Sequence, residues 1–203
     1  MGRLGRKNRC GISRRDFLIL VTIGMNDSPY VPLFEAMDRL VPKLNEKVIQ
    51  QIGSLQFTGK NSECFTYLPD TEMSEIFDSA SLIVCHAGIG TILNGLKRNI
   101  PLVLVPRNII DPSVEHDQQM IVARKIESMG RGVIVNDLTE LETKIEEARN
   151  LKMEPYVPDN KLCCFLTNLF KKLNSHSGER RYEGHHTSGR IGYALISINN
   201  CNI

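Results

Sequence analysis

The sequence predicts a doubly wound, parallel α/β sheet. Residues 17–23 (FLILVTI) form a continuous apolar run, as expected of a strand covered on both faces. Residues 81–91 (SLIVCHAGIGT) break from a second apolar run into a glycine-rich turn, and a helical pattern follows. The 203 residues, 41% of them hydrophobic, suffice for one substantial domain but are too few for two sheets of this size.

The first half of the chain alternates between strand and helix patterns. The strand Phe17–Ile23 ends at Gly24, and Ser28 and Pro29 supply an N-cap and a first-turn proline for a helix through about Leu40. That helix has apolar residues at core spacing, which are Leu33, Met37, Leu40 and Leu44. We then expect strands at 47–53 and 62–67, a short helix at 73–79 and a strand at 82–85.

The alternation continues after the glycine turn. We expect a helix at 92–98, a strand at 102–105, a helix at about 117–129, a strand at 132–135, and a helix that opens at Asp137 with Glu140 in capping-box spacing. Strands joined through helices pair in parallel, and ligands bind at their carboxyl ends. Residue Gly24 and the stretches 86–91 and 106–119 would lie at that edge.

The glycine-rich turn is a candidate phosphate site. Glycine lets the backbone approach an anion, and the unpaired N–H groups of a first helical turn point at it. The dinucleotide pattern G-x-G-x-x-G fails because Leu93 stands at the third glycine, and the Walker pattern is absent. A tight strand-to-helix turn without a ligand is the alternative.

Four segments together carry a resemblance to a known family. They read VTIG (21–24), LIVCHAGIGTILNGL (82–96), PLVLVPR (101–107) and EHDQQMIVARKIESMG (115–130). Over residues 17–147 the chain resembles the C-terminal, donor-binding domain of family 28 glycosyltransferases, which are MurG-like. Small catalytic subunits of two-part UDP-sugar transferases, which build dolichol-linked chitobiose or bacterial polysaccharides, belong to the same group. The resemblance implies a Rossmann-like fold that forms one half of a GT-B enzyme.

The resemblance also implies a nucleotide-sugar site. The diphosphate would bind at the glycine turn, made of His86, Ala87, Gly88, Gly90 and Thr91, with His86 a tentative catalytic residue near the sugar. The donor sugar would contact the segment His116, Asp117, Gln118 and Gln119.

Three further positions belong to the expected site. The loop at Gly24 would approach the donor phosphates or a partner domain, and Arg107 is a candidate charge for the leaving diphosphate. Family members often carry a carboxylate for the ribose diol where this chain has Asn94. Asparagine can still bond a diol, but without charge assistance.

Each of these residues also has a purely structural interpretation. His86 can be a core histidine, and His116 and Asp117 can cap the following helix. Gln118 and Gln119 can be surface residues of its first turn. Only the convergence of these residues at one sheet edge favours a binding site.

Composition limits the cofactors and the compartment. Six cysteines lack zinc spacing, and the site has no carboxylate pair, so we expect no metal ion and no cofactor beyond the UDP-sugar substrate. Unpatterned thiols indicate a reduced, cytoplasmic protein. No apolar run reaches the roughly 18 residues of a membrane span, so we expect only peripheral membrane contact. We expect no nucleic-acid partner.

The ends of the chain differ from its middle. Residues 1–15 are basic and without acids, and we expect a flexible extension; the twin-arginine pattern at 13–18 is rejected as an export signal because its apolar run is needed as the first strand. Residues 16–174 would form the α/β domain, and 175–203 a disordered tail. Within the domain, residues 161–173 have helical apolar spacing, which fits packing on the domain or docking to a partner.

These observations lead to one preferred function and two alternatives. We expect a glycosyltransferase subunit that moves a hexose or N-acetylhexosamine from a UDP-sugar to a lipid-linked or polysaccharide acceptor. Because the chain has only one α/β unit, the acceptor half is expected from a membrane-anchored partner subunit. The alternatives are a non-catalytic nucleotide-sugar-binding subunit and an epimerase-like nucleotide-sugar enzyme.

Overall fold

A computed structural model describes residues 18–24, 30–111, 118–156 and 164–169 of the chain. The chain divides into two compact units, Met1–Tyr156 and Val157–Ile203. In the second unit the described residues, 164–169, are helical, which agrees with part of the helix expected over 161–173. The expected extension at 1–15 and tail at 175–203 lie outside the described residues.

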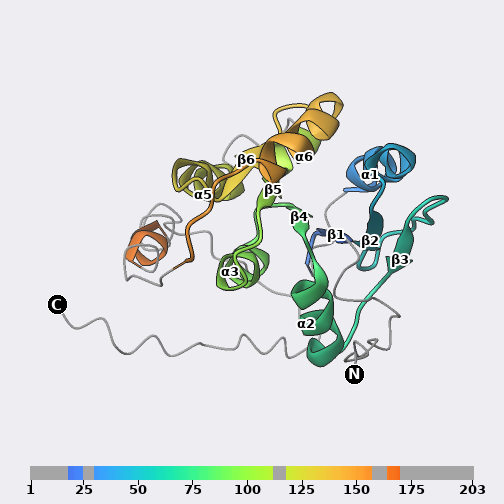
Figure 1. The fold of residues 1–203 in the computed structure, drawn as a ribbon, viewed down its shortest axis with the longest axis horizontal. Coiled ribbons are helices and arrows are strands. Elements are labelled where there is room, and N and C mark those ends of the chain that lie inside the picture. Colours follow the sequence, from blue (N-terminus) through green and yellow to red (C-terminus); the bar gives the residue numbers. More distant parts are fainter. Residues whose placement is uncertain (1–17, 25–29, 112–117, 157–163, 170–203) are drawn as a thin grey trace, which may run out of the picture. The chain divides into compact units, whose positions relative to one another are not determined.

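The first unit is built on a six-stranded parallel sheet, and the predicted fold class is confirmed (Figure 1). The strand order is β3-β2-β1-β4-β5-β6. The strands are β1 Leu18–Thr22, β2 Lys47–Gln51, β3 Glu63–Phe65, β4 Leu82–Cys85, β5 Leu102–Leu104 and β6 Gly132–Ile134. All six lie within one or two residues of the predicted ends. Strands β1, β4, β5 and β6 are short, fully buried runs bounded by turn residues, whereas β2 and β3 also contain polar residues.

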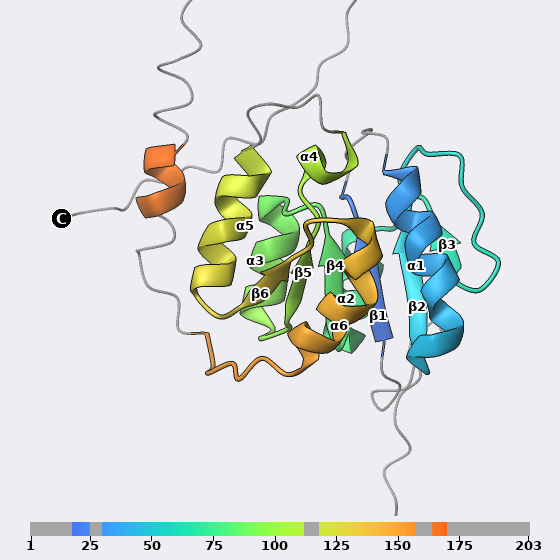
Figure 2. The ribbon, with the colours of Figure 1, turned by 90° about the horizontal axis from the view of Figure 1, so that it is seen from above.

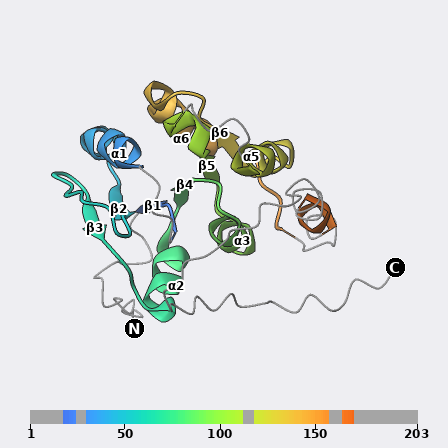
Figure 3. The ribbon, with the colours of Figure 1, turned by 180° about the vertical axis from the view of Figure 1, so that it is seen from behind.

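Helices cover both faces of this sheet. They are α1 Val31–Leu44, α2 Asp70–Ser79, α3 Ile89–Lys97, α4 Arg107–Ile110, α5 Gln118–Ser128 and α6 Leu141–Arg149, with a 3₁₀ turn η1 at Leu138–Glu140. Figure 1 and the opposite view in Figure 3 place α1 and α6 on one face and α2 and α3 on the other. Seen from above in Figure 2, α5 flanks the β6 edge. This two-sided arrangement is the doubly wound architecture.

The start of α1 differs from the prediction. Its N-cap is Tyr30, and Pro32 rather than Pro29 stands in the first turn, so the predicted cap at Ser28 is wrong. The helix also runs four residues past Leu40, to Leu44, with Pro42 inside it. Tyr30 is fully buried, and its carbonyl accepts hydrogen bonds from the Leu33 and Phe34 N–H groups at the start of the helix.

Two other helices differ from the prediction. Helix α4 was not predicted, because four residues after Pro106 carry no helical period. Helix α3 begins at Ile89 instead of Ile92, so the residues of the glycine turn form its first turn. The predicted cap at Asp137 is confirmed, since its carboxylate accepts from the Thr139 N–H at 2.8 Å, although the first turn is 3₁₀.

The core lies within the sheet and against its helices. Every residue of β1, β4, β5 and β6 is buried, as the continuous apolar runs predicted. Strands β1 and β4 are neighbours, with Leu20 opposite Ile83. The strand order reverses between them, so their following loops diverge and leave a crevice at the carboxyl edge. No helix in the described part of the chain is long and apolar enough to cross a membrane.

Candidate functional site

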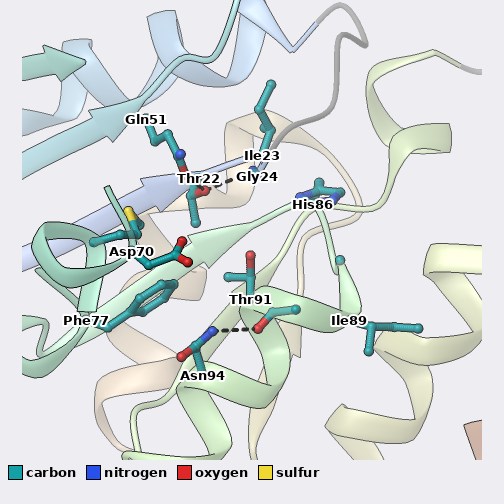
Figure 4. A pocket seen from close by; sticks show the side chains of 13 residues that line it. Thr22, Ile23, Gly24, Gln51, Asp70, Phe77, His86, Ile89, Thr91 and Asn94 are labelled. Carbon is teal, nitrogen blue, oxygen red and sulfur yellow. Dashed lines mark hydrogen bonds between the residues drawn. The ribbon is translucent and has the colours of Figure 1, made fainter. Parts of the chain in front are cut away.

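A pocket of about 640 Å³ opens at the carboxyl ends of β1 and β4, the point where the strand order reverses (Figure 4). Four chain segments line it: the end of β1, the end of β2, helix α2, and the turn from β4 into α3. The lining residues are Thr22, Ile23, Gly24, Gln51, Asp70, Met73, Phe77, His86, Gly88, Ile89, Gly90, Thr91 and Asn94. Six of them, Gly24, His86, Gly88, Gly90, Thr91 and Asn94, were predicted as site residues.

The imidazole of His86 is held between two glycines. A Cβ on Gly88 would lie 2.3 Å from the His86 Nε2 atom, and a Cβ on Gly24 would lie 3.6 Å from its Cε1 atom. Tyr30 packs edge-on against the same ring, with centroids 6.1 Å apart. Only 8% of His86 is exposed. The ring is therefore held in one place at the pocket wall, and Gly88 is required because any larger residue would displace it.

The turn after β4 contains a strained residue. Ala87 adopts a left-handed conformation with φ of 62°, which costs a non-glycine residue on the order of 1 kcal/mol. Its side chain is buried and does not line the pocket. Ala87 therefore acts on the predicted site through its backbone, because the reversal of the chain there places Gly88 next to the His86 ring.

The first turn of α3 presents backbone donors to the pocket. Gly88 is the N-cap, with extended backbone, and no side chain caps the helix. Gly90 has open space where its Cβ would stand, and Thr91 is buried with its hydroxyl directed into the pocket in Figure 4. Uncapped N–H groups at the positive end of a helix dipole favour an anion.

Two polar residues at strand ends form another wall, and the sequence analysis missed both. The Thr22 hydroxyl donates to Gln51 Oε1 at 2.6 Å and accepts from the Gly24 N–H at 2.9 Å. Gly24 has a φ of 65°, which a side chain would strain. Polar residues at the ends of otherwise apolar strands were the available signal. This pair fixes the predicted Gly24 loop at the rim.

Helix α2 supplies the wall opposite the glycine turn, and it too was missed. Asp70, Met73 and Phe77 are spaced by three and four residues and so lie on one face of the helix. Phe77 is largely buried, and Asp70 is exposed at the first helical position. An acidic first-turn residue is common in helices, so Asp70 alone gave no signal of a site.

The predicted residues beyond the pocket have structural contacts instead. Gln119 Oε1 accepts from the Arg107 N–H at 2.8 Å and from the Tyr30 hydroxyl at 3.1 Å. Neither Arg107 nor Gln118, which is exposed, lines the pocket. The predicted residues His116 and Asp117 lie outside the described residues.

Other chemistry at this edge is limited. Among the described residues no three side chains of His, Cys, Asp or Glu are grouped to hold a metal ion. Burial raises the pKa of the Cys85 thiol to about 12, despite a hydrogen bond from the Ala87 backbone. That thiol, at the end of β4, stays protonated and is no nucleophile at neutral pH.

A comparison with protein families finds a match over most of the chain. Residues 18–173 match the family described as the glycosyltransferase family 28 C-terminal domain. The match includes all six strands and the whole pocket.

Solved structures with a similar fold are glycosyltransferases. The glycotransferase of kitacinnamycin has a TM-score of 0.56 and 19% identity, covering 88% of this chain and 44% of that one. The glycosyltransferase SnogD from Streptomyces nogalater has a TM-score of 0.54 and 16% identity, and the match covers 74% of this chain and 39% of SnogD. The spinosyn rhamnosyltransferase SpnG has a TM-score of 0.55 and 15% identity, and the match covers 85% of this chain and 45% of SpnG. At these identities the likeness concerns the fold, and this chain spans less than half the length of each.

Proposed function

Because the chain belongs to the glycosyltransferase family 28 C-terminal domain family, we propose that it is the donor-binding half of a hexosyltransferase. The donor is a UDP-sugar, and the acceptor is a lipid-linked or polysaccharide chain held by a membrane-anchored partner subunit. The observation that carries the proposal is the uncapped first turn of α3, which borders a pocket at the reversal of strand order.

The pocket has two ends of different chemistry, which suits a nucleoside diphosphate. Around Gly88, Gly90 and Thr91, backbone donors and a hydroxyl favour the diphosphate. At the α2 wall, Met73 and Phe77 offer apolar surface to a base or ribose. One protein of similar fold, SpnG, is also known in complex with thymidine diphosphate, which supports this class of ligand.

Transfer requires the diphosphate to leave as the acceptor hydroxyl attacks the anomeric carbon. Preorganised N–H donors at α3 would stabilise the negative charge that develops on the diphosphate, without a metal ion. His86, fixed between Gly24 and Gly88, lines the pocket beside the glycine turn. A neutral imidazole there can accept the acceptor's proton.

The chain spans less than half the length of each of the solved transferases that it resembles, so transfer is proposed here only together with an acceptor-binding half. Holding donor and acceptor in line lowers the activation barrier by as much as about 7–11 kcal/mol in favourable cases. A donor-binding half alone does not hold the acceptor and so lacks this contribution. Transfer by the isolated chain should therefore be negligible.

The test combines titration and turnover. Isothermal titration with UDP, UDP-GlcNAc, UDP-Gal and NAD should show binding of uridine ligands and none of NAD. Sugar transfer to a lipid-linked acceptor should appear only when a membrane-anchored partner is co-expressed. Tight NAD binding would instead favour an epimerase-like enzyme, and UDP binding without transfer under any partner would favour a non-catalytic subunit. Robust transfer by this chain alone would refute the requirement for a partner.

A further inference from the structure

The side chain of Asn94 is engaged within its own helix. Its Nδ2 group donates to the Gly90 carbonyl at 3.0 Å, and its Oδ1 atom accepts from Arg98 Nη1 at 2.8 Å. A ligand diol needs an acceptor, and the acceptor atom of Asn94 is directed to a cation instead.

Arg98 is itself held firmly, so it does not readily release Asn94. Its Nε group pairs with Asp78 at 2.7 Å, its Nη2 group donates to Ser74 at 2.8 Å, and its guanidinium lies 5.5 Å from the centre of the Phe77 ring. The side chain is 21% exposed. These contacts join α3 to α2 and make the Asn94 oxygen part of a structural network.

Asp70 is the carboxylate that faces the same pocket. Within the described part of the chain it makes no hydrogen bond or ion pair, and it does not cap α2. Figure 4 shows its carboxylate directed toward the middle of the pocket, on the side of Thr22 and Thr91. It is therefore an available acceptor, in contrast to Asn94.

Charge decides which part of a nucleoside diphosphate Asp70 can face. A carboxylate repels phosphates, and the donors for phosphate lie at the α3 turn, on the other side of the pocket. The uncharged O–H donors next to the diphosphate of a UDP-sugar are the ribose hydroxyls on one side and the sugar hydroxyls on the other. Asp70 shares its face of α2 with Met73 and Phe77, the apolar surface that suits the base, so it stands on the ribose side. A carboxylate oxygen pair can accept from both ribose hydroxyls.

We propose that Asp70 accepts hydrogen bonds from the ribose hydroxyls of the donor, and that the pocket thereby selects ribonucleoside over 2′-deoxyribonucleoside diphosphates. This inference rests on the proposed function. It assigns to α2 a binding contact that the sequence placed on α3 at Asn94.

The test measures a ratio of affinities. Dissociation constants for UDP and 2′-deoxy-UDP are determined by calorimetry with the unmodified chain and with Asp70→Ala. The unmodified chain should bind UDP on the order of tenfold more tightly, as expected for one hydrogen bond to a charged acceptor. In Asp70→Ala the ratio should fall to about one. The ratio is informative because removing a negative charge changes the affinity for any anion equally.

Matched controls separate a ribose contact from a general effect. Glu72 is the other acid in the first turn of α2 but does not line the pocket, so Glu72→Ala should keep the ratio. Asn94→Ala should keep it as well, even if its absolute affinity changes. If thermal melting shows that Asp70→Ala folds poorly, the isosteric Asp70→Asn is used instead. Its affinity ratio should lie below that of the unmodified chain and above one.

The outcomes are distinct. A preserved ratio in the Asp70 variants, or a ratio near one in the unmodified chain, overturns the assignment of Asp70 while leaving the donor site in place. Loss of the ratio in Glu72→Ala or Asn94→Ala overturns it too. If the unmodified chain binds neither ligand, the proposed function itself fails.

Discussion

Gly88 and Gly90 stand two residues apart in the same turn, yet they meet opposite surroundings. A side chain on Gly88 would overlap the His86 ring, whereas a side chain on Gly90 would meet no atom within 4 Å. Substitution at Gly88 therefore disturbs the protein itself, and substitution at Gly90 fills only the space beside the pocket. This makes Gly90 the better position for testing ligand binding.

We predict that Gly90→Val folds normally and loses the rise in melting temperature that UDP produces. The valine would occupy space that a bound diphosphate needs, and at 100 times Kd a ligand stabilises by about 2.7 kcal/mol, so the lost shift is measurable. Thermal melting with and without UDP checks this, with the melting temperature of the free variant as the control. An unchanged UDP shift would contradict the assignment of the phosphate site.

Asp38 illustrates a residue with a structural task. This buried carboxylate of α1 accepts hydrogen bonds from the backbone N–H groups of Lys60, Asn61 and Ser62 and from the Ser62 hydroxyl. Burial by itself would raise the pKa of the Asp38 carboxyl, but the Ser62 hydroxyl and the three backbone groups outweigh it and hold that pKa below 3.8. The loop that leads into β3 is thus tied to α1.

We predict that Asp38→Ala lowers the free energy of unfolding by about 2 kcal/mol at pH 7, as for lost hydrogen bonds to a buried charge. Because the folded-state pKa lies below the unfolded one, this stabilisation is complete above about pH 4 and is lost as the pH falls through the folded value. Urea unfolding between pH 7 and pH 3 measures it. A difference between variant and parent that stays constant over this range would speak against the ionised carboxylate.

At the scale of elements, Gln119 joins three helices. It lies in α5, and its amide oxygen accepts two hydrogen bonds. One comes from the Tyr30 hydroxyl at the start of α1, and the other from the Arg107 N–H at the start of α4. Its contact with the donor sugar remains a prediction. A substitution would lower the stability of the fold if the role is structural, and the affinity for the donor sugar if the role is binding.

We predict that Gln119→Ala costs about 1 kcal/mol of stability, because the Arg107 N–H and the Tyr30 hydroxyl lose a shared acceptor. Urea unfolding tests the structural role. Affinities for UDP and UDP-GlcNAc test the other, since a sugar contact would weaken only the second. The exposed neighbour Gln118 is the matched control, and equal stability losses in both variants would exclude a special structural role for Gln119.

At the scale of the whole molecule, the pocket depends on the sheet topology. Residues far apart in the chain, from Thr22 to Asn94, meet because β1 and β4 are neighbours in the sheet while their following loops diverge. The negative charge of a diphosphate bound as proposed would be stabilised by the uncapped first turn of helix α3. No described cluster of carboxylates supplies a metal for that purpose.

We therefore predict that EDTA leaves UDP affinity largely unchanged. Backbone N–H groups and a helix dipole do not depend on divalent cations. Calorimetric titration of UDP in EDTA, and again with added magnesium or manganese, measures the effect. A loss of affinity in EDTA that either cation restores would show that a metal takes part in donor binding.

The sequence by itself determined the alternation of elements and the position of the glycine turn. Continuous apolar runs predict buried parallel strands, since each strand is covered on both faces. The glycine pattern predicts Gly88, Gly90 and Thr91 as pocket residues, because a turn between adjacent elements is specified by neighbours in the chain.

Only the tertiary structure decided which polar residues complete the pocket. Thr22, Gln51 and Asp70 come from separate elements, and no local pattern states that they share a wall. The same holds for Arg98, which Asp78 and Ser74 of α2 hold against Asn94, and for Gln119, which accepts from Tyr30 far along the chain. Local periodicity reports burial and turns, whereas the partner of a polar side chain depends on contacts that form when distant elements pack.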